Sequence, residues 1–593
     1  MCGIIGQFQK EQPILRPVFE QKVQQLIHRG PDGQGIWMSP DEHLALGHTR
    51  LSFLDLSQKG SQPFTTSDQK VILTFNGEIY NFKALRADLK ANYQFTTQSD
   101  TEVVLAAYLH WGADCVKYFE GMFAFCILDL DTNSAFLARD PFGIKPLYYA
   151  LNEHLFVFGS ELKALIPTPG LSVELDPTSV IDYLVYRYVP SPKTIWKGIH
   201  KLAPAQTARL DLSTYELNID TYWDPIDKPH FEQKQFNTEA FSAEFERSVQ
   251  QHLEADVPVG GFLSGGYDSS ALAKAAKSLQ TEYTTFTVGF SAWENSEAQA
   301  AAKVASQLQQ ENHQVELDDS SLALLDKMPT VYDEPIADIS IIPTFAVSNL
   351  AAQHRKAVLS GEGADELFIG YHWQKEWHLK QQLPSWKKLF RPVPDLLSFY
   401  TASMAMGEFN RSILLQALTP AFAEALPQDL SWFYRSQLKT TKEPIKALQY
   451  LDQKCFMGEL VLTKIDRASM SNSLEVRVPF LKKQTFEQIH SSPTKSYARP
   501  GISKFPIYEY LRSTFSKEHL QRPKQGFVGP DSYYMNKEFY QKAFENAYLV
   551  SDGIIQKKFI EAELKQDYSW RLWKLLVLEK WYAHWRQYRT KEM

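Results

Sequence analysis

The chain has 593 residues, of which 44% are hydrophobic and 22% are charged, and its formal net charge is −7. This composition is typical of a globular protein of several domains, and the negative charge excludes the broad basic surface of a nucleic-acid-binding protein. The amino terminus lacks the pattern of a signal peptide, and no apolar stretch is long enough to cross a bilayer. We therefore expect a cytoplasmic protein with reduced cysteines, no membrane contact and no nucleic-acid partner.

The first part of the chain predicts sheets with helices packed on them. Short β-rich runs bounded by turn residues indicate strands at residues 71–75, 123–128, 135–138, 147–150 and 155–158. Helical spacing of apolar residues predicts helices at 82–90 and 101–111. Residues 214–236 are polar and contain Pro225 and Pro229, so we interpret them as a linker between domains of residues 2–213 and 237–593.

The second domain has a different pattern. Residues 241–253 predict an amphipathic helix, and an apolar strand at 257–263 runs into a glycine-containing turn and another helix. Further strands, at 284–290 and 356–359, alternate with helical segments. This order predicts a doubly wound α/β fold with ligands at the carboxyl ends of its parallel strands. From about residue 371 the chain is expected to be mostly helical, with a tryptophan stripe near its end that indicates core packing.

Cys2 follows the initiator methionine. If the methionine is removed, the thiol and the free α-amine belong to one residue. The amine has an ordinary pKa of about 7.7–8.0 and the thiol one of about 8.5, so either group can hold the shared proton. Nucleophile and general base then come together, as in hydrolases with a terminal Thr or Cys nucleophile. A cysteine at this position is by itself only a weak indication of catalysis.

Four polar clusters, at residues 28–33, 47–51, 76–81 and 99–102, would each be read as a turn if taken singly. Together with the terminal cysteine they provide what an amide hydrolase requires. Asn76 and the backbone N–H of Gly77 could donate to the oxyanion that develops on a carboxamide. An amino-acid substrate also needs Arg50 for its α-carboxylate, and Asp100 with Glu78 for its α-ammonium.

Four segments together carry a resemblance to a known family: residues 2–4 (CGI), 28–33 (HRGPDG), 76–81 (NGEIYN) and 139–148 (RDPFGIKPLY). In order and spacing they resemble the glutaminase domain of class II glutamine amidotransferases. The resemblance implies an amino-terminal nucleophile hydrolase with an α-β-β-α sandwich. It also implies that Cys2 forms a γ-glutamyl thioester and releases ammonia.

A second candidate site begins at residues 264–270 (SGGYDSS), between a predicted strand and its helix. Backbone N–H groups and hydroxyls at a helix amino terminus form an anion cradle, and Asp268 could hold Mg²⁺ against phosphates. The Gly-Lys-Ser/Thr ending of a kinase-type P-loop is absent, and a turn without function is the plain alternative. The motif resembles the pyrophosphate loop of ATP pyrophosphatases, which transfer AMP rather than phosphate.

Carboxylates and cations gather in three further segments. Residues 360–368 (SGEGADELF) follow the third strand, and 332–335 (YDEP), with Asp338 and Ser340, precede it. We expect Mg²⁺ to compensate these carboxylates. Lys464 and Arg477 are the cations that we place near a phosphate or a charged acceptor, although a buried salt-bridged helix end would give the same pattern.

This constellation resembles the synthetase domain of glutamine-hydrolysing asparagine synthases, and with the first domain the resemblance spans nearly the whole chain. It implies a mixed α/β and α+β protein: the sandwich, then a doubly wound parallel-sheet ATP-pyrophosphatase domain with a helical carboxyl-terminal region. The implied pyrophosphate ligands are Ser264, Gly265, Gly266, Asp268 and Ser269. The implied adenosine contacts are Leu263, Val288, Ser360 and Gly361. The implied Mg²⁺ ligands are Asp268 and Asp365, while Glu362 assists acyl-adenylate formation and Lys464 stabilises charge as ammonia attacks.

The resemblance further implies an ATP- and glutamine-dependent synthesis of asparagine from aspartate, with ammonia passing through a dry interdomain tunnel. Four segments depart from the usual family pattern: Ile369, Lys482-Lys483, Pro204-Ala205-Gln206 and residues 293–297. These departures leave a different acceptor open, such as a sugar acid or a secondary metabolite. An inactive binding or regulatory homologue is a third reading. A homodimer is one alternative for the oligomeric state, which the sequence leaves open.

Overall fold

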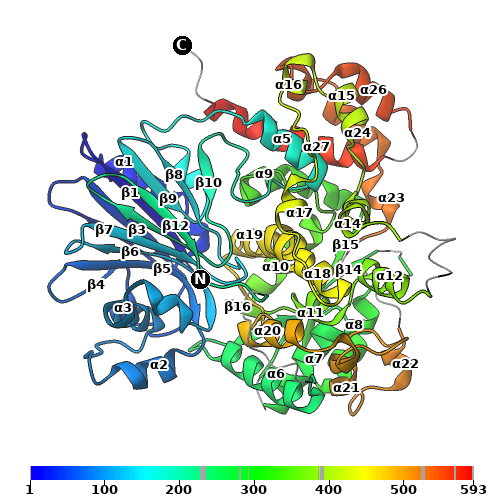
Figure 1. Cartoon of the computed structure of the whole chain (residues 1–593), viewed down its shortest axis with the longest axis horizontal. Helices are drawn as coiled ribbons and strands as arrows, with labels where there is room; N and C mark the ends of the chain where they lie inside the picture. The colour runs from blue at the N-terminus through cyan, green and yellow to red at the C-terminus, as the bar shows by residue number, and fades with distance from the viewer. Residues whose placement is uncertain are drawn as a thin grey trace.

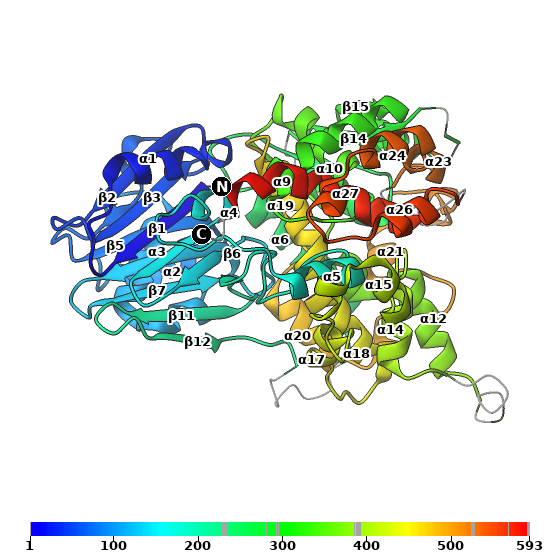
Figure 2. The same cartoon turned by 90° about the horizontal axis from the view of Figure 1, so that it is seen from above.

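The computed structural model describes residues 2–226, 235–279, 282–291, 293–294, 296–384, 386, 393–522, 528–566 and 569–589. A β-rich amino-terminal region, blue to cyan, lies beside a larger region in which helices surround a smaller sheet (Figure 1). The view from above keeps the two regions side by side (Figure 2). Residues 227–234 of the expected linker and Asn295 of the departing segment lie outside the described residues.

Two antiparallel six-stranded sheets form the amino-terminal region. The first has the strand order β10-β8-β9-β1-β3-β2 and the second β12-β11-β7-β6-β5-β4. In chain order the strands are β1 (Cys2–Gln9), β2 (Gly33–Met38), β3 (Leu44–Arg50), β4 (Phe64–Thr65), β5 (Val71–Ile79), β6 (Gly121–Asp129), β7 (Ser134–Arg139), β8 (Tyr148–Leu151), β9 (Leu155–Gly159), β10 (Ile199–Lys201), β11 (Gln206–Asp211) and β12 (Leu217–Thr221).

Helices cover the outer faces of both sheets. Helices α1 (Arg16–Gln24) and α4 (Leu162–Leu165) contact the first sheet, while α2 (Phe82–Leu89) and α3 (Asp100–Trp111) pack on the second. Neighbouring residues of β1 face opposite ways, since Ile4 joins the core between the sheets and Ile5 joins the core under α1. Because both faces are covered, the strands read as continuous apolar runs. The predicted α-β-β-α sandwich is confirmed.

The strands and helices predicted in this region are confirmed as β5 to β9 and as α2 and α3. Within the range expected as a linker, residues 217–221 form β12 and pair with β11. This strand lies at the edge of its sheet, and four of its five residues are exposed. An exposed edge strand lacks the apolar signal from which strands are recognised in a sequence.

The second region contains a parallel five-stranded sheet of order β15-β14-β13-β16-β17. Its strands are β13 (Val259–Phe262), β14 (Thr285–Phe290), β15 (Asn312–Leu317), β16 (Ala357–Leu359) and β17 (Glu475–Arg477). The connecting helices include α7 (Tyr267–Ser278), α8 (Ala298–Leu308) and α10 (Ile341–Ala352). The strand order reverses between β13 and β16, and ligands of doubly wound sheets bind at such a switch point. The predicted α/β fold is confirmed.

Helices make up most of the remaining chain. They are α5 (Pro177–Tyr186), α6 (Thr238–Leu253), α9 (Met328–Tyr332), α11 (Ala364–Phe368), α12 (His372–Gln381), α14 (Leu396–Met404), α15 (Arg411–Ala417), α16 (Pro420–Ala423), α17 (Trp432–Ser436), α18 (Pro444–Leu451), α19 (Leu462–Met470), α20 (Lys483–Ser491), α21 (Phe505–Leu511), α22 (Lys517–Leu520), α23 (Asp531–Tyr534), α24 (Lys537–Phe544), α25 (Tyr548–Ser551), α26 (Lys557–Glu563) and α27 (Trp570–Trp585). None of those in the described part of the chain combines the length and apolar character that a membrane span requires.

The tryptophan stripe on α27 has a structural role, as predicted. The indole N–H groups of Trp573, Trp581 and Trp585 donate to the backbone carbonyls of Ala337, Asp333 and Pro329 at 3.2, 2.7 and 2.9 Å. Buried indoles need such partners. The stripe thereby fixes the carboxylate-rich segment 329–338 against the terminal helix.

Candidate active sites

Cys2 begins β1 and pairs with Arg50 of β3. The residue is 8% exposed, and its carbonyl accepts a hydrogen bond from Nε of Arg29 at 3.1 Å. The next backbone N–H, that of Gly3, donates to Oγ1 of Thr49 at 3.1 Å. Burial raises the pKa of the Cys2 thiol above its ordinary value. A buried thiol therefore needs a nearby base to become a thiolate, as the terminal-amine hypothesis requires.

Asn76 lies on β5, fully buried behind the cysteine. Its Oδ1 accepts a hydrogen bond from the Cys2 backbone N at 3.0 Å, which turns its Nδ2 the other way. Nδ2 is buried and has no hydrogen-bond partner among the described residues. An unpaired buried donor costs about 1–3 kcal/mol, and an oxyanion formed at the cysteine would satisfy it.

A cavity of about 350 Å³ collects most of the residues predicted to bind glutamine. Its lining includes Cys2, Arg50, Gly77, Glu78 and Asp100, together with Leu51, Ser52, Phe53, Leu54, Gly60, Gln62, Phe75, Ser99 and Thr101. Residues far apart in the sequence thus converge because β1, β3, β5 and the start of α3 meet at one edge of the sandwich.

The ionisable groups of this cavity differ in their partners. Arg50 donates to the backbone carbonyls of Ser57 and Asp55 at 2.9 and 2.5 Å, so it also shapes the loop beside the cavity. Asp100 accepts from the backbone N–H of Ile79 at 3.0 Å. Burial raises the pKa of Asp100 to about 6. Its carboxylate is therefore charged at neutral pH and close to its titration range.

Gly77 and Glu78 have additional structural roles. A Cβ atom at Gly77 would lie 2.1 Å from the carbonyl oxygen of Met122, so packing against β6 alone already requires glycine. Glu78 forms an ion pair with Nη2 of Arg477 at 3.4 Å. Burial raises the pKa of Glu78 well above its ordinary value, and Arg477 opposes that shift.

The position of Arg477 corrects the sequence-based prediction for this residue. Its fully buried guanidinium contacts Glu475 at 2.5 Å and the carbonyls of His252 and Glu254 at 2.8 and 2.9 Å, besides Glu78. It thus belongs to the domain boundary beside the glutamine cavity rather than to a phosphate site. The alternative reading, a buried salt bridge, is confirmed for this residue.

The second site forms where the loops after β13 and β16 meet. Gly265 has φ +75°, and a Cβ there would lie 2.7 Å from the backbone of Ala300. The Ser264 backbone N–H donates to Oγ of Ser269 at 3.2 Å, and the Gly266 N–H to Oγ of Ser264 at 3.3 Å. The loop is thus closed on itself ahead of α7, as an anion cradle at a helix amino terminus would be.

The loop after β16 packs directly on this first loop. A Cβ at Gly361 would lie 2.7 Å from Cβ of Asp268, so glycine is required for the close approach. Oε2 of Glu362 is buried and has no hydrogen-bond partner within the described ranges. Burial raises the pKa of Glu362, while Ser360 and Lys464 act in the opposite direction. Lys464 itself contacts Oγ of Ser340 at 2.5 Å.

The hydrophobic residues predicted to contact adenosine lie at the same edge. Leu263 follows β13 and is 2% exposed, and Val288 on the neighbouring strand β14 is 4% exposed. The Leu263 backbone N–H donates to the Phe286 carbonyl at 2.9 Å, and the Leu263 carbonyl accepts from Oγ1 of Thr287 at 2.7 Å. Adjacent strands therefore bring the two side chains to one end of the sheet.

Segment 332–340, whose carboxylates we expected Mg²⁺ to compensate, has lysine partners in the structure. Asp333 pairs with Lys163 at 3.2 Å, Glu334 with Lys201 at 3.0 Å and Asp338 with Lys464 at 3.3 Å. Although burial opposes ionisation, Lys464 and other neighbours lower the pKa of Asp338 to about 2. Within the described ranges, no three His, Cys, Asp or Glu side chains are grouped as metal ligands.

Asp268 and Asp365, the other predicted Mg²⁺ ligands, converge on one point. Both carboxylates contact the ammonium of Lys504, Asp365 at 2.7 Å. Their oxygens are the ligand type that Mg²⁺ prefers. The donor set therefore fits a divalent cation, with a lysine ammonium lying between the two carboxylates.

A buried ion network between the domains was not predicted. Arg29 contacts Glu161 at 2.7 Å and Asp466 at 3.0 Å, and Arg467 contacts the same Glu161 oxygen at 2.7 Å. Asp466 and Arg467 lie on α19, the helix that carries Lys464. The network thus joins the backbone of Cys2 to a helix of the second site. Arg29 belongs to the cluster at 28–33, and Asp466 and Arg467 closely follow Lys464, but sequence spacing alone could not pair them with each other or with Glu161.

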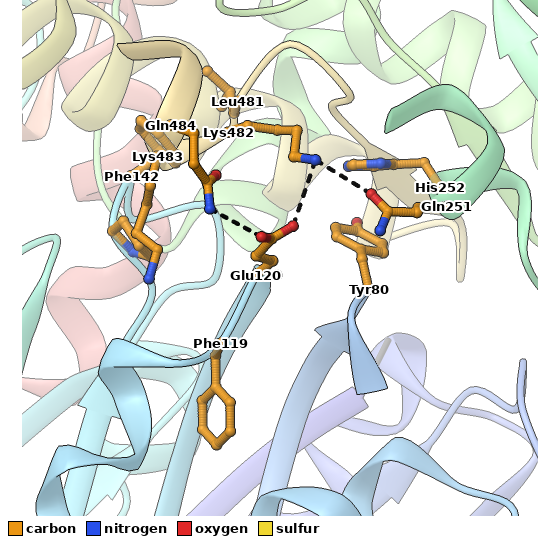
Figure 3. Close-up of a pocket in the computed structure, with 12 residues that line it drawn as sticks. Tyr80, Phe119, Glu120, Phe142, Gln251, His252, Leu481, Lys482, Lys483 and Gln484 are labelled. Atoms are coloured by element: carbon orange, nitrogen blue, oxygen red, sulfur yellow. Dashed lines mark hydrogen bonds and ion pairs between the residues drawn. The ribbon is translucent and has the colours of Figure 1, made fainter. Parts of the chain in front are cut away.

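A pocket of about 340 Å³ lies between the domains, beside the segment that follows Asn76 (Figure 3). Lys482 reaches across it to Glu120 at 3.4 Å and to Gln251 at 3.3 Å, and Gln484 donates to Glu120 at 2.9 Å. Lys482 also pairs with Glu244 at 2.6 Å. These partners explain why a lysine stands where the family usually has an acidic residue.

Comparison with known proteins gives a family for each of the two domains. Residues 1–223 match the family model of the glutamine amidotransferase domain, and residues 240–583 match that of asparagine synthase. Glutamine-hydrolyzing asparagine synthetase 1 of Bacillus subtilis (strain 168) is 33% identical over 98% of this chain and 96% of its own length. Amidase chry2 of Gibberella zeae is 26% identical over 96% of this chain and 94% of its own length. The chain therefore belongs to the glutamine-hydrolysing asparagine synthase family of ATP-dependent amide ligases, which take their nitrogen from glutamine.

Proposed function

We propose that this protein synthesises asparagine from aspartate, with Cys2 hydrolysing glutamine and the second site activating the acceptor with ATP. The geometry around Cys2 supports the proposal. Oδ1 of Asn76 accepts a hydrogen bond from the Cys2 backbone N, and Nδ2 of Asn76, which has no partner among the described residues, is left to bind an oxyanion. The similarity to the Bacillus subtilis asparagine synthetase over almost the whole chain supports the choice of aspartate.

The proposed glutamine reaction begins when the terminal amine accepts the thiol proton. The Cys2 sulfur then attacks the carboxamide carbon, and Asn76 Nδ2 with the Gly77 N–H donate to the oxyanion. Collapse breaks the C–N bond and expels ammonia, which takes up the proton and leaves a γ-glutamyl thioester. Water then cleaves the thioester to give glutamate and the free thiol. Arg50 and Asp100 would hold the α-carboxylate and the α-ammonium of glutamine.

In the proposed synthetase reaction the β-carboxylate of aspartate attacks the α-phosphorus of ATP. Pyrophosphate leaves and β-aspartyl-AMP forms, after which ammonia attacks the acyl carbon and AMP leaves. The loop of Ser264, Gly265, Gly266 and Ser269 would hold the pyrophosphate. Bound Mg²⁺, held by Asp268 and Asp365, would neutralise phosphate charge. Lys464 would stabilise charge as ammonia attacks.

We also propose that ammonia passes between the sites without entering bulk water. Ammonium is not a nucleophile, so a dry route preserves the reactive form. Apolar residues support this proposal: Leu51 and Phe53 of the glutamine cavity belong to the same buried core as Met122, Ile144 and residues of the second domain.

To identify the acceptor, purified enzyme is incubated with ATP, glutamine and one candidate carboxylic acid at a time, and the release of pyrophosphate is measured. Aspartate should give release together with asparagine. If a different carboxylic acid gives pyrophosphate release and aspartate gives none, the acceptor is not aspartate, but the proposed adenylation and amidation steps still hold. The similarity to amidase chry2 favours this second candidate, a non-aspartate carboxylate.

A non-catalytic role is tested at Cys2. Wild type should hydrolyse glutamine, whereas Cys2→Ala should not, while still forming the amide from added ammonia. Equal glutamate release by both proteins would remove Cys2 from the mechanism. No hydrolysis by either, in folded protein, would favour a binding or regulatory homologue.

A further inference from the structure

Lys504 is the residue whose position is least expected from the sequence. It precedes α21, which packs against α7 near the helix end that carries Asp268 (Figure 1). Its side chain is 4% exposed, and its ammonium contacts Asp268 from the first turn of α7 and Asp365 from α11. One protein cation thus bridges the two carboxylates that the family resemblance assigns to Mg²⁺.

The surrounding backbone is shaped around this lysine. Lys504 has φ +48°, a left-handed conformation that costs a residue other than glycine roughly 1–2 kcal/mol. A Cβ at Gly370 would lie 1.8 Å from Oδ1 of Asp365 and 2.5 Å from Cε of Lys504. Strain that is kept in place by close packing is typical of functional positions. The lysine is therefore built into the site rather than resting at its surface.

Lys504 is held by geometry on both sides. Its ammonium lies within ion-pair distance of the Asp268 carboxylate and of the Asp365 carboxylate. Among the described cations, Lys464 pairs with Asp338 and Lys163 with Asp333. Lys504 lies between Asp268 and Asp365, where its charge reduces the repulsion between the two converging carboxylates.

We propose that Lys504 is an internal counter-cation of the nucleotide site, which holds Asp268 and Asp365 together and gives up this place when Mg²⁺ and nucleotide arrive. The inference rests on the proposed binding of Mg²⁺-ATP at these carboxylates. Phosphate oxygens offer the ammonium a second anionic partner, and the flexible four-carbon stem of lysine lets it turn toward them. Lys504 is then a positioning residue that disfavours a free divalent cation before nucleotide binds.

The first test uses Mn²⁺ alone, titrated without nucleotide and followed by electron paramagnetic resonance. Lys504→Met should bind Mn²⁺ about tenfold more tightly than wild type, because two carboxylates lose their cation. Adding Asp365→Asn to Lys504→Met should abolish the gain. Unchanged Mn²⁺ affinity in folded Lys504→Met would overturn the proposal, as would a gain that survives Asp365→Asn.

The second test measures nucleotide. Binding of Mg²⁺-ATP to Lys504→Met should weaken about tenfold, since the phosphates lose a cation. Lys193→Met is the matched control, because it removes a lysine from another buried carboxylate, Asp182, and both affinities should stay at the wild-type value. Mn²⁺ binding that tightens equally in this control would contradict the assignment.

If Lys504→Met does not fold, Lys504→Gln keeps hydrogen-bond donors near the carboxylates and should show the same two changes. Neither titration uses glutamine or an acceptor acid. If the enzyme does not use aspartate but Lys504→Met still binds Mn²⁺ more tightly, the assignment of aspartate as the acceptor is wrong and the proposed role of Lys504 stands.

Discussion

Asn76 shows at the scale of one residue how a side chain can serve both structure and chemistry. Its oxygen accepts a hydrogen bond from the Cys2 backbone, so only its nitrogen remains for a substrate.

Ile369 is a second example at this scale. It stands where the family usually has glycine, and its backbone has φ +55°. A β-branched residue in this conformation is strained. Nothing in the structure explains what compensates this strain.

Asn76→Asp should remove the oxyanion donor with almost no change in shape. We expect kcat for glutamine hydrolysis to fall about 10²–10³-fold, as for other single oxyanion donors. The measurement is glutamate release. Amide formation from added ammonia should stay at the wild-type rate, and an equal loss of both activities would assign Asn76 a purely structural role.

Asp100 predicts a pH dependence of glutamine binding. Its pKa of about 6 means that the carboxylate gains a proton as the pH falls through 6 and then no longer attracts the α-ammonium. In Cys2→Ala, which should bind glutamine without consuming it, the Kd should rise about tenfold per pH unit below 6. Calorimetry from pH 8 to 5 measures this. With Asp100→Asn added, binding should be weak and flat with pH; a rise that persists there would implicate another group.

At the scale of elements, the turns between strands and helices decide where chemistry can occur. The loop after β13 and the loop after β16 approach within contact because Gly361 packs on Asp268. In the sandwich, the RDPFGIKPLY motif has a comparable role. Asp140 accepts from the backbone N–H groups of Ile144 and Lys145 at 3.0 and 2.8 Å, which fixes the turn that brings Ile144 to the domain boundary.

Gly265→Ala should separate backbone strain from collision. Gly265 and Gly553 both have positive φ, but a Cβ at Gly265 meets the Ala300 backbone whereas nothing lies within 4 Å of one at Gly553. Backbone strain should lower the free energy of unfolding by about 1 kcal/mol in each variant, and Gly265→Ala should lose more because its Cβ also collides with the Ala300 backbone. Only Gly265→Ala should weaken Mg²⁺-ATP binding, by at least about tenfold in calorimetry. Equal nucleotide binding by both variants would remove this loop from the phosphate site.

At the scale of the whole molecule, the two domains share a buried core and a buried ion network. Arg29 links the Cys2 carbonyl to Asp466 on α19, and Lys482 links α6 of the second domain to Glu120 of the first. Removing one partner of such a buried pair typically costs about 3–5 kcal/mol. These links therefore hold one site in a defined position relative to the other.

Lys482→Glu tests whether this docking matters for nitrogen transfer. The new carboxylate would face Glu120 and Glu244, so the domain boundary should loosen. We expect glutamate release to continue while amide product per glutamate falls, roughly by half or more. The ratio of the two products measures this. Lys483→Glu, which alters a lysine that donates to the exposed carbonyl of Lys117, should keep the wild-type ratio; a similar fall there would contradict the role of Lys482.

Much of the architecture could be predicted from the sequence because it depends on local patterns. Alternating and continuous apolar runs indicated β5 to β9 and the strands around β13, β14 and β16. Glycine-rich turns with neighbouring polar residues indicated both sites, and the structure brings Cys2, Arg50, Glu78 and Asp100 to one cavity. Strand β12 was missed because its exposed residues carry no apolar period.

The sequence by itself determined the fold class, the family and the residue types present at each site, since these follow from periodicity and from motif order along the chain. Only the tertiary structure decided which charges meet. Lys163, Lys201 and Lys464 neutralise carboxylates that had been assigned to Mg²⁺, Arg477 lies at the glutamine site, and Lys504 bridges Asp268 and Asp365. Electrostatic pairing depends on distances of a few ångströms between residues hundreds of positions apart, and no local pattern encodes those distances.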